Sequence, residues 1–514
     1  MRLTLIPVLV SSLCTLALPA LAQDRPSSHL ADDLYALTDA IGPRIAGSDA
    51  ERRAREWVTE RLRTLGVQDV HVDTVAAMDI GGGVLLDPPG WTWTRCVVQQ
   101  RTPWATTLIG VPALYSPGTA GPVRGGLYVA PLPRFVEADV TAFIERHRGR
   151  LASKFLLLRE TPAPVERDRL PPAGIYTPEQ LMALSNFVPE PATSPASPPA
   201  RSSGTPAPSG RDPRLVQQDR LMTFLRNEGA LGLIGAGGSE SQGGSIATSV
   251  IPVPPSIVVS PPPTVDLTPE HFNRLLSFAQ RGENAEIELN VEVQTTTASG
   301  IHSVIGDLAG SDRADEIVMV GAHLDSLPGA TGATDNATGV VTVLEALRLL
   351  VARNTPLRRT VRVAFWGGEE LGLQGSRAYV RRHLQDDQGR PTPSAARLSA
   401  YFNLDYGSGR IRGVYLQGRR SLKPLFDRWL GEIDSRGELV ATLRTTLGSD
   451  QAMFERAGVP GLSFVQDPLD YEMRTHHTTM DLSDYVRIPD VAASAATLAA
   501  ILERVANAPD LLPR

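Results

Sequence analysis

The chain has 514 residues, with 50 Lys and Arg residues against 56 Asp and Glu residues, for a formal net charge of -6 at pH 7. This length exceeds that of one ordinary hydrophobic core and predicts two or more domains. The mildly acidic balance argues against a nucleic-acid partner, because nucleic-acid-binding proteins usually carry a basic surface.

The N-terminal residues have the pattern of a secretory signal peptide. Arg2 gives a short positive region, an apolar stretch follows, and Ala20 and Ala22 form a small-x-small cleavage pattern. We therefore expect a signal peptide over 1–22, cleavage after Ala22, and a periplasmic or secreted location. No later stretch is long and apolar enough to cross a bilayer. After cleavage only Cys96 remains, so the exported protein can form no internal disulfide.

The region after the signal peptide begins with a helix and a strand. In SDAERRAREWVTERLRTLGV (48–67), Ser48 or Asp49 can cap an amphipathic helix whose apolar residues fall on one face. The alternating stretch VQDVHVDTV (67–75) predicts a strand. Residues 23–99 are therefore assigned to the N-terminal part of an α/β domain.

Residues 100–265 differ in character from their surroundings. Short apolar runs, such as KFLLLRE (154–160) and LGLIGAG (231–237), are separated by Gly and Pro. This pattern predicts a small, inserted, β-rich domain. Within it, the segment 187–213 is rich in Pro, Ser and Ala and predicts an exposed, poorly ordered loop.

Strands and helices alternate again over 266–514. The apolar runs EIVMVGAHLD (316–325), TVRVAFWGGEE (360–370) and AYFNLDYG (400–407) each end in polar residues. Between the first two, GVVTVLEALRLLVAR (339–353) predicts a helix. Such alternation is typical of an α/β fold with a mostly parallel twisted sheet and helices on both faces. In such sheets the functional site lies at the carboxyl ends of the strands.

Acidic and imidazole side chains follow almost every predicted strand of this region. They are His323, Asp325, Asp335, Glu369, Glu370, Asp405, His476 and His477. Each alone is weak evidence, but together they suit metal-assisted hydrolysis. Zinc binds imidazole nitrogen and carboxylate oxygen, and two zinc ions roughly 3.5–4 Å apart need a bridging carboxylate. Of two adjacent glutamates, one can then bind metal while the other accepts a proton from water.

Five segments, in this order, resemble the co-catalytic zinc exopeptidases, a family that includes bacterial and yeast aminopeptidases and carboxypeptidase Q. They are GAHLDS (321–326), GATDNATG (332–339), WGGEELGLQGS (366–376), NLDYG (403–407) and HHTTMD (476–481). The N-terminal segment 37–75 is most similar to the carboxypeptidase Q branch, in which a protease-associated β-domain is inserted between the opening helix and the catalytic core. The resemblance therefore implies that 100–265 is such a domain and that 266–514 is the catalytic zinc-peptidase domain.

The resemblance implies a ligand set for two Zn²⁺ ions per chain. Asp335 would bridge both ions. The pairs that complete the two sites would be His323 with Asp405, and Glu370 with His477.

Other roles follow from the same resemblance. Glu369 would be the general base, and Asp325 would orient the imidazole of His323. The peptide bond between Asp335 and Asn336 would be cis.

Two residues keep alternative interpretations. Several aminopeptidases of the family have a tyrosine at the position of His476, so His476 is either a hydrogen-bond donor to the developing oxyanion or a structural histidine. The choice of His477 rather than His476 as ligand rests on analogy with the histidine that precedes Thr478. Asp450 either caps a helix, which we expect, or lines the pocket.

The leading hypothesis is an exopeptidase that cleaves one residue from a short peptide. A single-zinc glutaminyl cyclase on the same fold and a non-catalytic, receptor-like binding protein are the alternatives. The complete ligand set and an intact Glu369 argue against both. Neither Ser326 nor Ser376 lies in a GxSxG elbow, so a serine hydrolase is not indicated. The sequence does not decide between aminopeptidase and carboxypeptidase or dipeptidase polarity.

Overall fold

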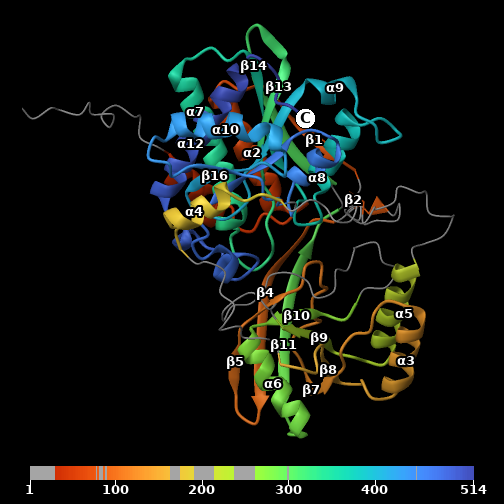
Figure 1. The fold of residues 1–514 in the computed structure, drawn as a ribbon. Helices are drawn as coiled ribbons and strands as arrows, with labels where there is room; N and C mark the ends of the chain where they lie inside the picture. Colours follow the sequence, from red (N-terminus) through yellow and green to blue (C-terminus); the bar gives the residue numbers. More distant parts are fainter. Residues whose placement is uncertain are drawn as a thin grey trace, which may run out of the picture.

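The structure is a computed structural model of the chain. It describes residues 29–76, 78–79, 85–86, 89–162, 174–189, 213–236, 261–297, 300–446 and 448–514. The expected signal peptide lies outside these residues, as do residues 190–212 of the Pro/Ser-rich segment. Two eight-stranded sheets organise two lobes, which Figure 1 shows one above the other as an upper lobe and a lower lobe.

The sheet of the upper lobe is mixed, with a parallel centre. Its strands, in spatial order, are β1 (Gln68–Val75), β12 (Ile301–Leu308), β14 (Arg359–Trp366), β13 (Arg313–His323), β15 (Leu398–Asn403), β18 (Gly461–Gln466), β16 (Ile411–Tyr415) and β17 (Val440–Thr442). The strands β14, β13, β15 and β18 run parallel, whereas β1, β12 and β16 add antiparallel pairings. The predicted α/β fold class is confirmed.

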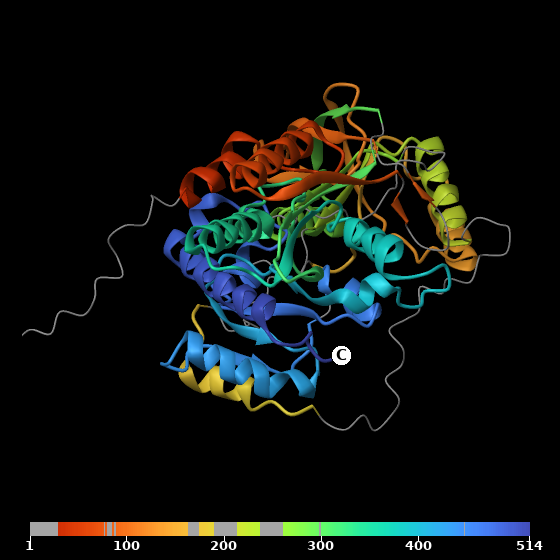
Figure 2. The ribbon, with the colours of Figure 1, turned by 90° about the horizontal axis from the view of Figure 1, so that it is seen from above.

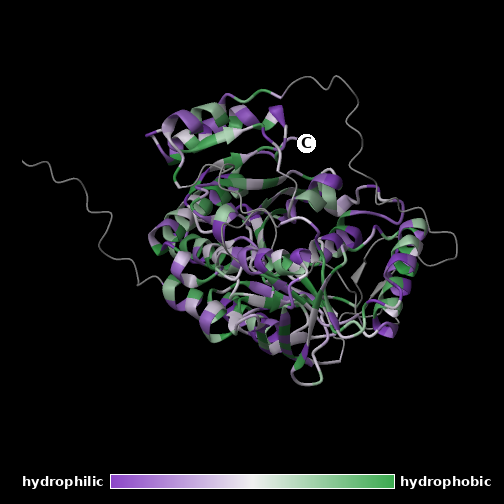
Figure 3. Ribbon diagram, turned by 90° about the horizontal axis from the view of Figure 1, so that it is seen from below, coloured by the Kyte–Doolittle hydropathy of each residue, from purple (hydrophilic) through white to green (hydrophobic). Residues whose placement is uncertain are grey.

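Both faces of this sheet are covered by helices, because its central strands are apolar on both sides. In β13, Val318 and Val320 face one hydrophobic core, whereas Met319 faces another. The first core includes side chains from five helices: α1 (Leu30–Tyr35), α2 (Asp49–Thr64), α7 (Thr338–Arg353), α10 (Lys423–Ile433) and α12 (Ile488–Asn507). The second core includes side chains from α8 (Gln374–Tyr379), α9 (Pro393–Arg397) and α11 (Gln451–Arg456). Surface helices alternate hydrophilic and hydrophobic residues (Figure 3).

The predicted N-terminal helix and strand are α2 and β1. The side chain of Ser48 caps α2 by accepting a hydrogen bond from the backbone N–H of Glu51. Ala54, Val58 and Leu62 are buried on its inner face, as the helical spacing of apolar residues requires.

The lower lobe has the second sheet. Its strands, in spatial order, are β5 (Thr106–Leu108), β4 (Trp91–Thr102), β11 (Glu286–Thr295), β7 (Val123–Val129), β8 (Lys154–Leu157), β9 (Gly232–Ala236), β10 (Thr264–Leu267) and β6 (Gly110–Pro112). The helices α3 (Glu137–His147), α5 (Pro213–Asn227) and α6 (Pro269–Arg281) pack on it (Figure 1).

The sheet pairing places residues 269–295 in the lower lobe, although the sequence analysis assigns 266–514 to one catalytic domain. The strand β11 pairs with β4 and β7, and Phe272 and Leu275 of α6 belong to the same core as Ile287 of β11. Alternation along β11 indicates a half-buried strand but carries no information about which sheet the strand joins. The start of β4 at Trp91 likewise precedes the expected boundary at residue 100.

One segment of the lower lobe's sequence lies on the upper lobe. Residues 174–189, here named the strap, contain α4 (Pro178–Ser185) and follow β8 in the chain. The helix α4 contacts β17, and Figure 2 shows it (yellow) beside α10 (light blue). The expected β-rich insertion therefore reaches the far edge of the first sheet.

Within the described ranges, none of the helices combines the length and the apolar composition that crossing a bilayer requires.

Candidate metal centre

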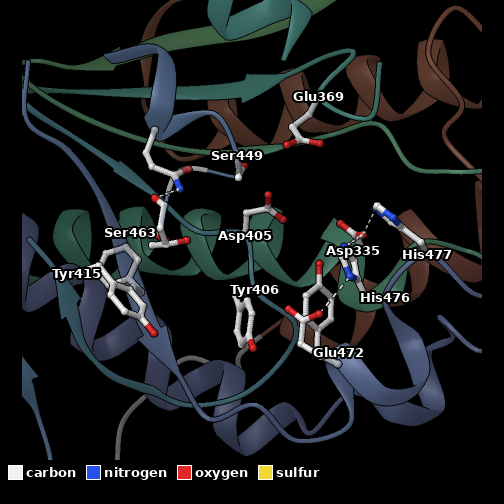
Figure 4. A pocket seen from close by; sticks show the side chains of 15 residues that line it. Asp335, Glu369, Asp405, Tyr406, Tyr415, Ser449, Ser463, Glu472, His476 and His477 are labelled. Carbon is white, nitrogen blue, oxygen red and sulfur yellow. Dashed lines mark hydrogen bonds and ion pairs between the residues drawn. The ribbon is translucent and has the colours of Figure 1, made fainter. Parts of the chain in front are cut away.

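The eight side chains singled out from the sequence gather at the carboxyl end of the parallel strands. His323 is the last residue of β13, the two glutamates follow β14, and Asp405 follows β15. Asp335 lies just before α7, and His476 and His477 lie in the loop after β18. Figure 4 shows Glu369, Asp405, Asp335 and both C-terminal histidines around one cavity. Parallel strand order brings these distant segments together.

Asp335 occupies the middle of this group. Its Oδ1 lies 3.0 Å from His323 Nε2, and its Oδ2 lies 3.3 Å from His477 Nε2. His323 Nε2 is also 3.2 Å from Asp405 Oδ1, and His477 Nε2 is 3.1 Å from Glu370 Oε2. The two oxygens of Asp335 therefore face two separate pairs of side chains. The peptide bond between Asp335 and Asn336 is cis, which confirms that expectation.

The donor set fits metal ions. Three overlapping groups have ligand atoms within 4.8 Å of one another: Asp335, His476 and His477; His323, Glu369 and Asp405; and His323, Asp335 and Glu370. Within these groups, Glu370 Oε1 and Asp335 Oδ2 are buried without a hydrogen bond. A buried carboxylate oxygen without a donor is costly unless a cation neutralises it. The cluster thus requires positive charge and offers the ligand types that zinc prefers.

Burial and charge perturb the titration of the cluster. Burial raises the pKa of Glu369 well above its ordinary value and also raises the pKa of Glu370. Burial lowers the pKa of His323, but the nearby carboxylates, led by Asp405, outweigh it and raise that pKa well above its usual range. Protons and metal ions compete for such sites, because ligands must be deprotonated to bind metal.

Asp325 holds the turn that carries both glutamates. Its Oδ1 accepts a hydrogen bond from Glu369 N at 3.1 Å, and its Oδ2 accepts one from Glu370 N at 3.3 Å. Its backbone carbonyl lies 3.0 Å from His323 Nδ1, whereas its carboxylate lies 3.7 Å from that nitrogen. The backbone carbonyl of Asp325 is therefore the nearer acceptor for the imidazole, whereas the sequence analysis expects the carboxylate to orient it.

Arg44 is a residue that the sequence analysis did not single out. Its side chain is fully buried, and its guanidinium donates hydrogen bonds to five backbone carbonyls. They are those of Leu324 (2.8 Å), Leu37 (3.1 Å), Gly42 (3.5 Å), Thr331 (2.7 Å) and Gly332 (2.8 Å). Arg44 thus holds both ends of the loop that connects two candidate ligands, His323 and Asp335. Its only sequence signal is its place in the segment 37–75.

Asp481 supports Asp335 from the other side. Its Oδ1 accepts hydrogen bonds from the backbone N–H of Thr334 at 2.6 Å and from the hydroxyl of Thr334 at 2.7 Å. Its Oδ2 accepts a hydrogen bond from the backbone N–H of Asp335 at 3.1 Å. Burial raises the pKa of Asp481 to about 6. Asp481 is the last residue of the segment HHTTMD, so that motif contributes both histidines and this support.

The expectation that Asp450 caps a helix is wrong. It precedes α11, but its side chain makes no capping hydrogen bond. Instead it is fully buried, its Oδ1 accepts a hydrogen bond from the Ser376 hydroxyl, and its Oδ2 has no hydrogen bond. Burial raises its pKa to about 7. Local sequence cannot distinguish an Asp that caps from an Asp that is drawn into the core by a distant hydroxyl.

A cavity of about 350 Å³ opens onto this cluster. Its aromatic walls come from Tyr406, Tyr415, Phe464 and Tyr471, and its polar groups include Ser449, Gln451, Ser463 and Glu472. Figure 4 labels Tyr415, Tyr406 and Glu472 among these lining residues. The described lining residues include no Lys or Arg.

Comparison with known proteins agrees with this geometry. The family model described as Peptidase family M28 matches residues 303–502, which include every side chain of the cluster. This segment belongs to peptidase family M28. Carboxypeptidase Q of Pongo abelii is 27% identical over 262 residues, which cover 49% of this chain and 51% of that protein. The chain thus matches about half the length of this curated relative.

Two solved structures share the whole architecture. The peptidase M28 precursor of Shewanella amazonensis SB2B superposes with a TM-score of 0.64 at 22% identity, over 95% of each chain. BSAP, a zinc aminopeptidase of Bacillus subtilis, superposes with a TM-score of 0.54 at 21% identity, over 94% of this chain and 96% of that one. Both likenesses concern the fold.

We predict that Arg44→Met destabilises the upper lobe. Five carbonyls lose a donor, and each buried group left unsatisfied costs about 1–3 kcal/mol, so the unfolding free energy should fall by at least about 3 kcal/mol. Thermal unfolding followed by calorimetry measures the change. Arg397→Met, at the exposed end of α9, is the matched control. Equal melting temperatures for the two variants would contradict the role given to Arg44.

Proposed function

We propose that this chain is a di-zinc metallo-exopeptidase that removes one residue from the end of a short peptide. The observation that carries the proposal is the position of Asp335, whose two oxygens face two separate pairs of ligand side chains. The match to peptidase family M28 supports the reaction class.

The two ions would be held by five side chains. His323 and Asp405 would hold one, Glu370 and His477 the other, and Asp335 would contribute one oxygen to each. When bound, zinc lowers the pKa of a water molecule and polarises the carbonyl of the scissile bond. Proton transfer and hydrogen bonding to the developing oxyanion would be carried out by protein groups that bind no metal.

Glu369 is the proposed general base. It lines the cavity, and Asp325 fixes its backbone through the hydrogen bond to Glu369 N. Its carboxylate would accept the proton of the attacking water and deliver that proton to the leaving amine. Of the two adjacent glutamates, Glu370 would therefore bind metal and Glu369 would transfer the proton.

His476 is the proposed donor to the oxygen that becomes negative during the reaction. Its Nδ1 lies 3.5 Å from Glu472 Oε2, and its Nε2 lies 3.8 Å from Asp335 Oδ2. Burial lowers the pKa of His476, but Glu472 and Asp335 outweigh burial and raise it. A protonated imidazole in the cavity can stabilise developing negative charge.

The charge of the cavity favours binding of a peptide's amino end. A hydrogen bond from His476 and another from Tyr406 help to lower the pKa of Glu472, which therefore stays ionised. A free ammonium group is attracted to this carboxylate, whereas a free carboxylate meets no Lys or Arg among the described lining residues. We therefore propose aminopeptidase polarity. Similarity to carboxypeptidase Q makes the opposite polarity the second candidate.

The alternatives on this fold are less well supported. A glutaminyl cyclase with one zinc would not need both pairs of ligands beside Asp335. A receptor-like binding protein would not need Glu369 in the cavity. The lower lobe is, by our proposal, a protease-associated domain inserted into the peptidase.

Glu369→Gln should lower kcat by about 10²- to 10⁴-fold, because the amide cannot accept the proton of water. Elemental analysis should find two zinc ions per chain in the variant as in the wild type. Leu-p-nitroanilide, an unblocked dipeptide and an N-acetylated dipeptide are the substrates. Cleavage of the first two indicates aminopeptidase polarity, and cleavage of the N-acetylated dipeptide indicates carboxypeptidase polarity.

The control for this substitution is Glu60→Gln, on the exposed side of α2, which should behave as the wild type. One zinc ion per chain and no hydrolysis of any of the three substrates would point to the cyclase. Full activity in Glu369→Gln would refute its role as the base.

Substitution of His477 and substitution of His476 should have different effects on the zinc content of the protein. His477→Ala removes a ligand and should lose one of two zinc ions in a titration. His476→Ala should keep both ions and lose about 10²- to 10³-fold in kcat, as expected for removal of an oxyanion donor. If both variants lose zinc equally, the assignment of the ligand is wrong.

The proposed periplasmic or secreted location rests on the signal-peptide pattern of 1–22. Expression of the full chain in a bacterial host should yield exported protein whose N-terminal sequence begins at Gln23. Recovery of the protein in the cytoplasm with residues 1–22 still attached would contradict this location.

A further inference from the structure

The strap (174–189) belongs to the lower lobe by sequence and to the upper lobe by contact. In the chain it lies between β8 and α5, which are both elements of the lower lobe. Its partners, however, are β17, β18 and the loop after β18. The chain thus leaves one lobe, contacts the other next to the cavity and returns.

Backbone hydrogen bonds join the first residues of the strap to the loop that leads to the histidines. Gly174 and Leu469 form a two-way bridge, with N–O distances of 3.1 Å and 2.9 Å. The backbone N–H of Tyr176 donates to Asp467 Oδ1 at 2.9 Å, and Asp467 is itself buried. The strap therefore fixes the loop three residues before Glu472.

Apolar contacts hold the rest of the strap. Leu181 and Leu184 of α4 are buried against Val440 of β17 and Val465 of β18. Further along, the ring of Phe187 lies 5.1 Å from the guanidinium carbon of Arg444. Burial of two leucines makes the attachment specific rather than a chance surface contact.

Shared packing connects the strap to the wall of the cavity. Tyr176 and Tyr415 pack against the same apolar cluster, which Leu181 and Leu184 of α4 form with Val440 and Val465, and Tyr415 lines the cavity. Tyr406 and Glu472 line the same cavity. Glu472 in turn pairs with His476. Tyr415, Tyr406, Glu472 and His476 line the same cavity in Figure 4.

We propose that the strap sets the substrate preference of the peptidase, with Tyr176 as the positioning residue that fixes Tyr415 as a wall of the side-chain pocket. This inference rests on the proposed function. Tyr176 does not line the cavity, so it acts through Tyr415 and through the loop that carries Glu472.

The lining of the pocket indicates which terminal residues the strap favours. Aromatic walls contributed by Tyr406, Tyr415 and Phe464 suit a bulky, uncharged side chain such as that of leucine or phenylalanine. A small side chain such as that of alanine does not reach the wall. Release of Tyr415 therefore weakens binding of bulky residues more than binding of alanine.

Tyr176→Ala tests this inference, because it removes the ring that packs with Tyr415 on the shared cluster. The ratio of kcat/KM for Leu-p-nitroanilide to that for Ala-p-nitroanilide should fall about 3- to 10-fold, the size expected when one of two coupled neighbours is removed. The change should appear in KM, because Tyr415 contacts the side chain and not the reacting atoms. Zinc content should equal that of the wild type.

A double-mutant cycle distinguishes coupling from general damage. Tyr415→Ala should lower the same ratio, and Tyr176→Ala combined with Tyr415→Ala should lower it no further than Tyr415→Ala alone. Tyr35→Ala is the control, because Tyr35 is 62% exposed on α1. Additive effects, an equal loss for both substrates, or an unchanged ratio in Tyr176→Ala would each overturn the inference while the proposed function stands. A wild-type protein that cleaves neither substrate nor any dipeptide would overturn the proposed function itself.

Discussion

Negative charge buried at the strand ends is the constraint on which the upper lobe depends. Asp335 and both glutamates lie where water cannot solvate them fully, and burial of a carboxylate is tolerated only beside positive charge or hydrogen-bond donors. The surrounding main chain is organised for that purpose. Asp325 holds the turn of the glutamates, Asp481 holds the peptide of Asp335, and Arg44 joins the loops between them. These contacts place the acidic oxygens toward one another, a geometry that is stable only when cations or protons lie between them.

Much of this centre could be predicted from sequence, because parallel strands expose their carboxyl ends on one edge. Each apolar run that ends in an acid or a histidine marks a position there, and the eight residues so identified do meet. Arg44 and Asp481 could not be found in this way, since both act on backbone groups of loops far away in sequence. Asp450 shows the opposite failure: its local pattern resembles a helix cap, but its side chain reaches Ser376 in the core.

The division of the chain between the two lobes was also only partly predictable. Alternation identifies β11 as a strand, but pairing with β4 rather than with β12 depends on contacts that the pattern does not encode. The strap is harder still, because its short helix directly precedes the Pro- and Ser-rich segment 187–213. Its packing against β17 and β18 shows that a segment of the lower lobe's sequence can leave that lobe's core and contact the sheet beside the cavity.

The pairing of β4 with β11 affects the order in which the protein can fold. Arg44 and Leu324 are 280 residues apart in sequence, and closing so long a loop is entropically unfavourable. In the lower lobe, however, Trp91 at the start of β4 lies opposite Thr295 at the end of β11. Once the lower lobe has folded, Trp91 and Thr295 are neighbours. The contact between Arg44 and Leu324 then closes a loop that consists only of the chain segments outside this lobe. Folding of the lower lobe thus assists assembly of the metal centre, since it brings the two parts of the upper lobe together.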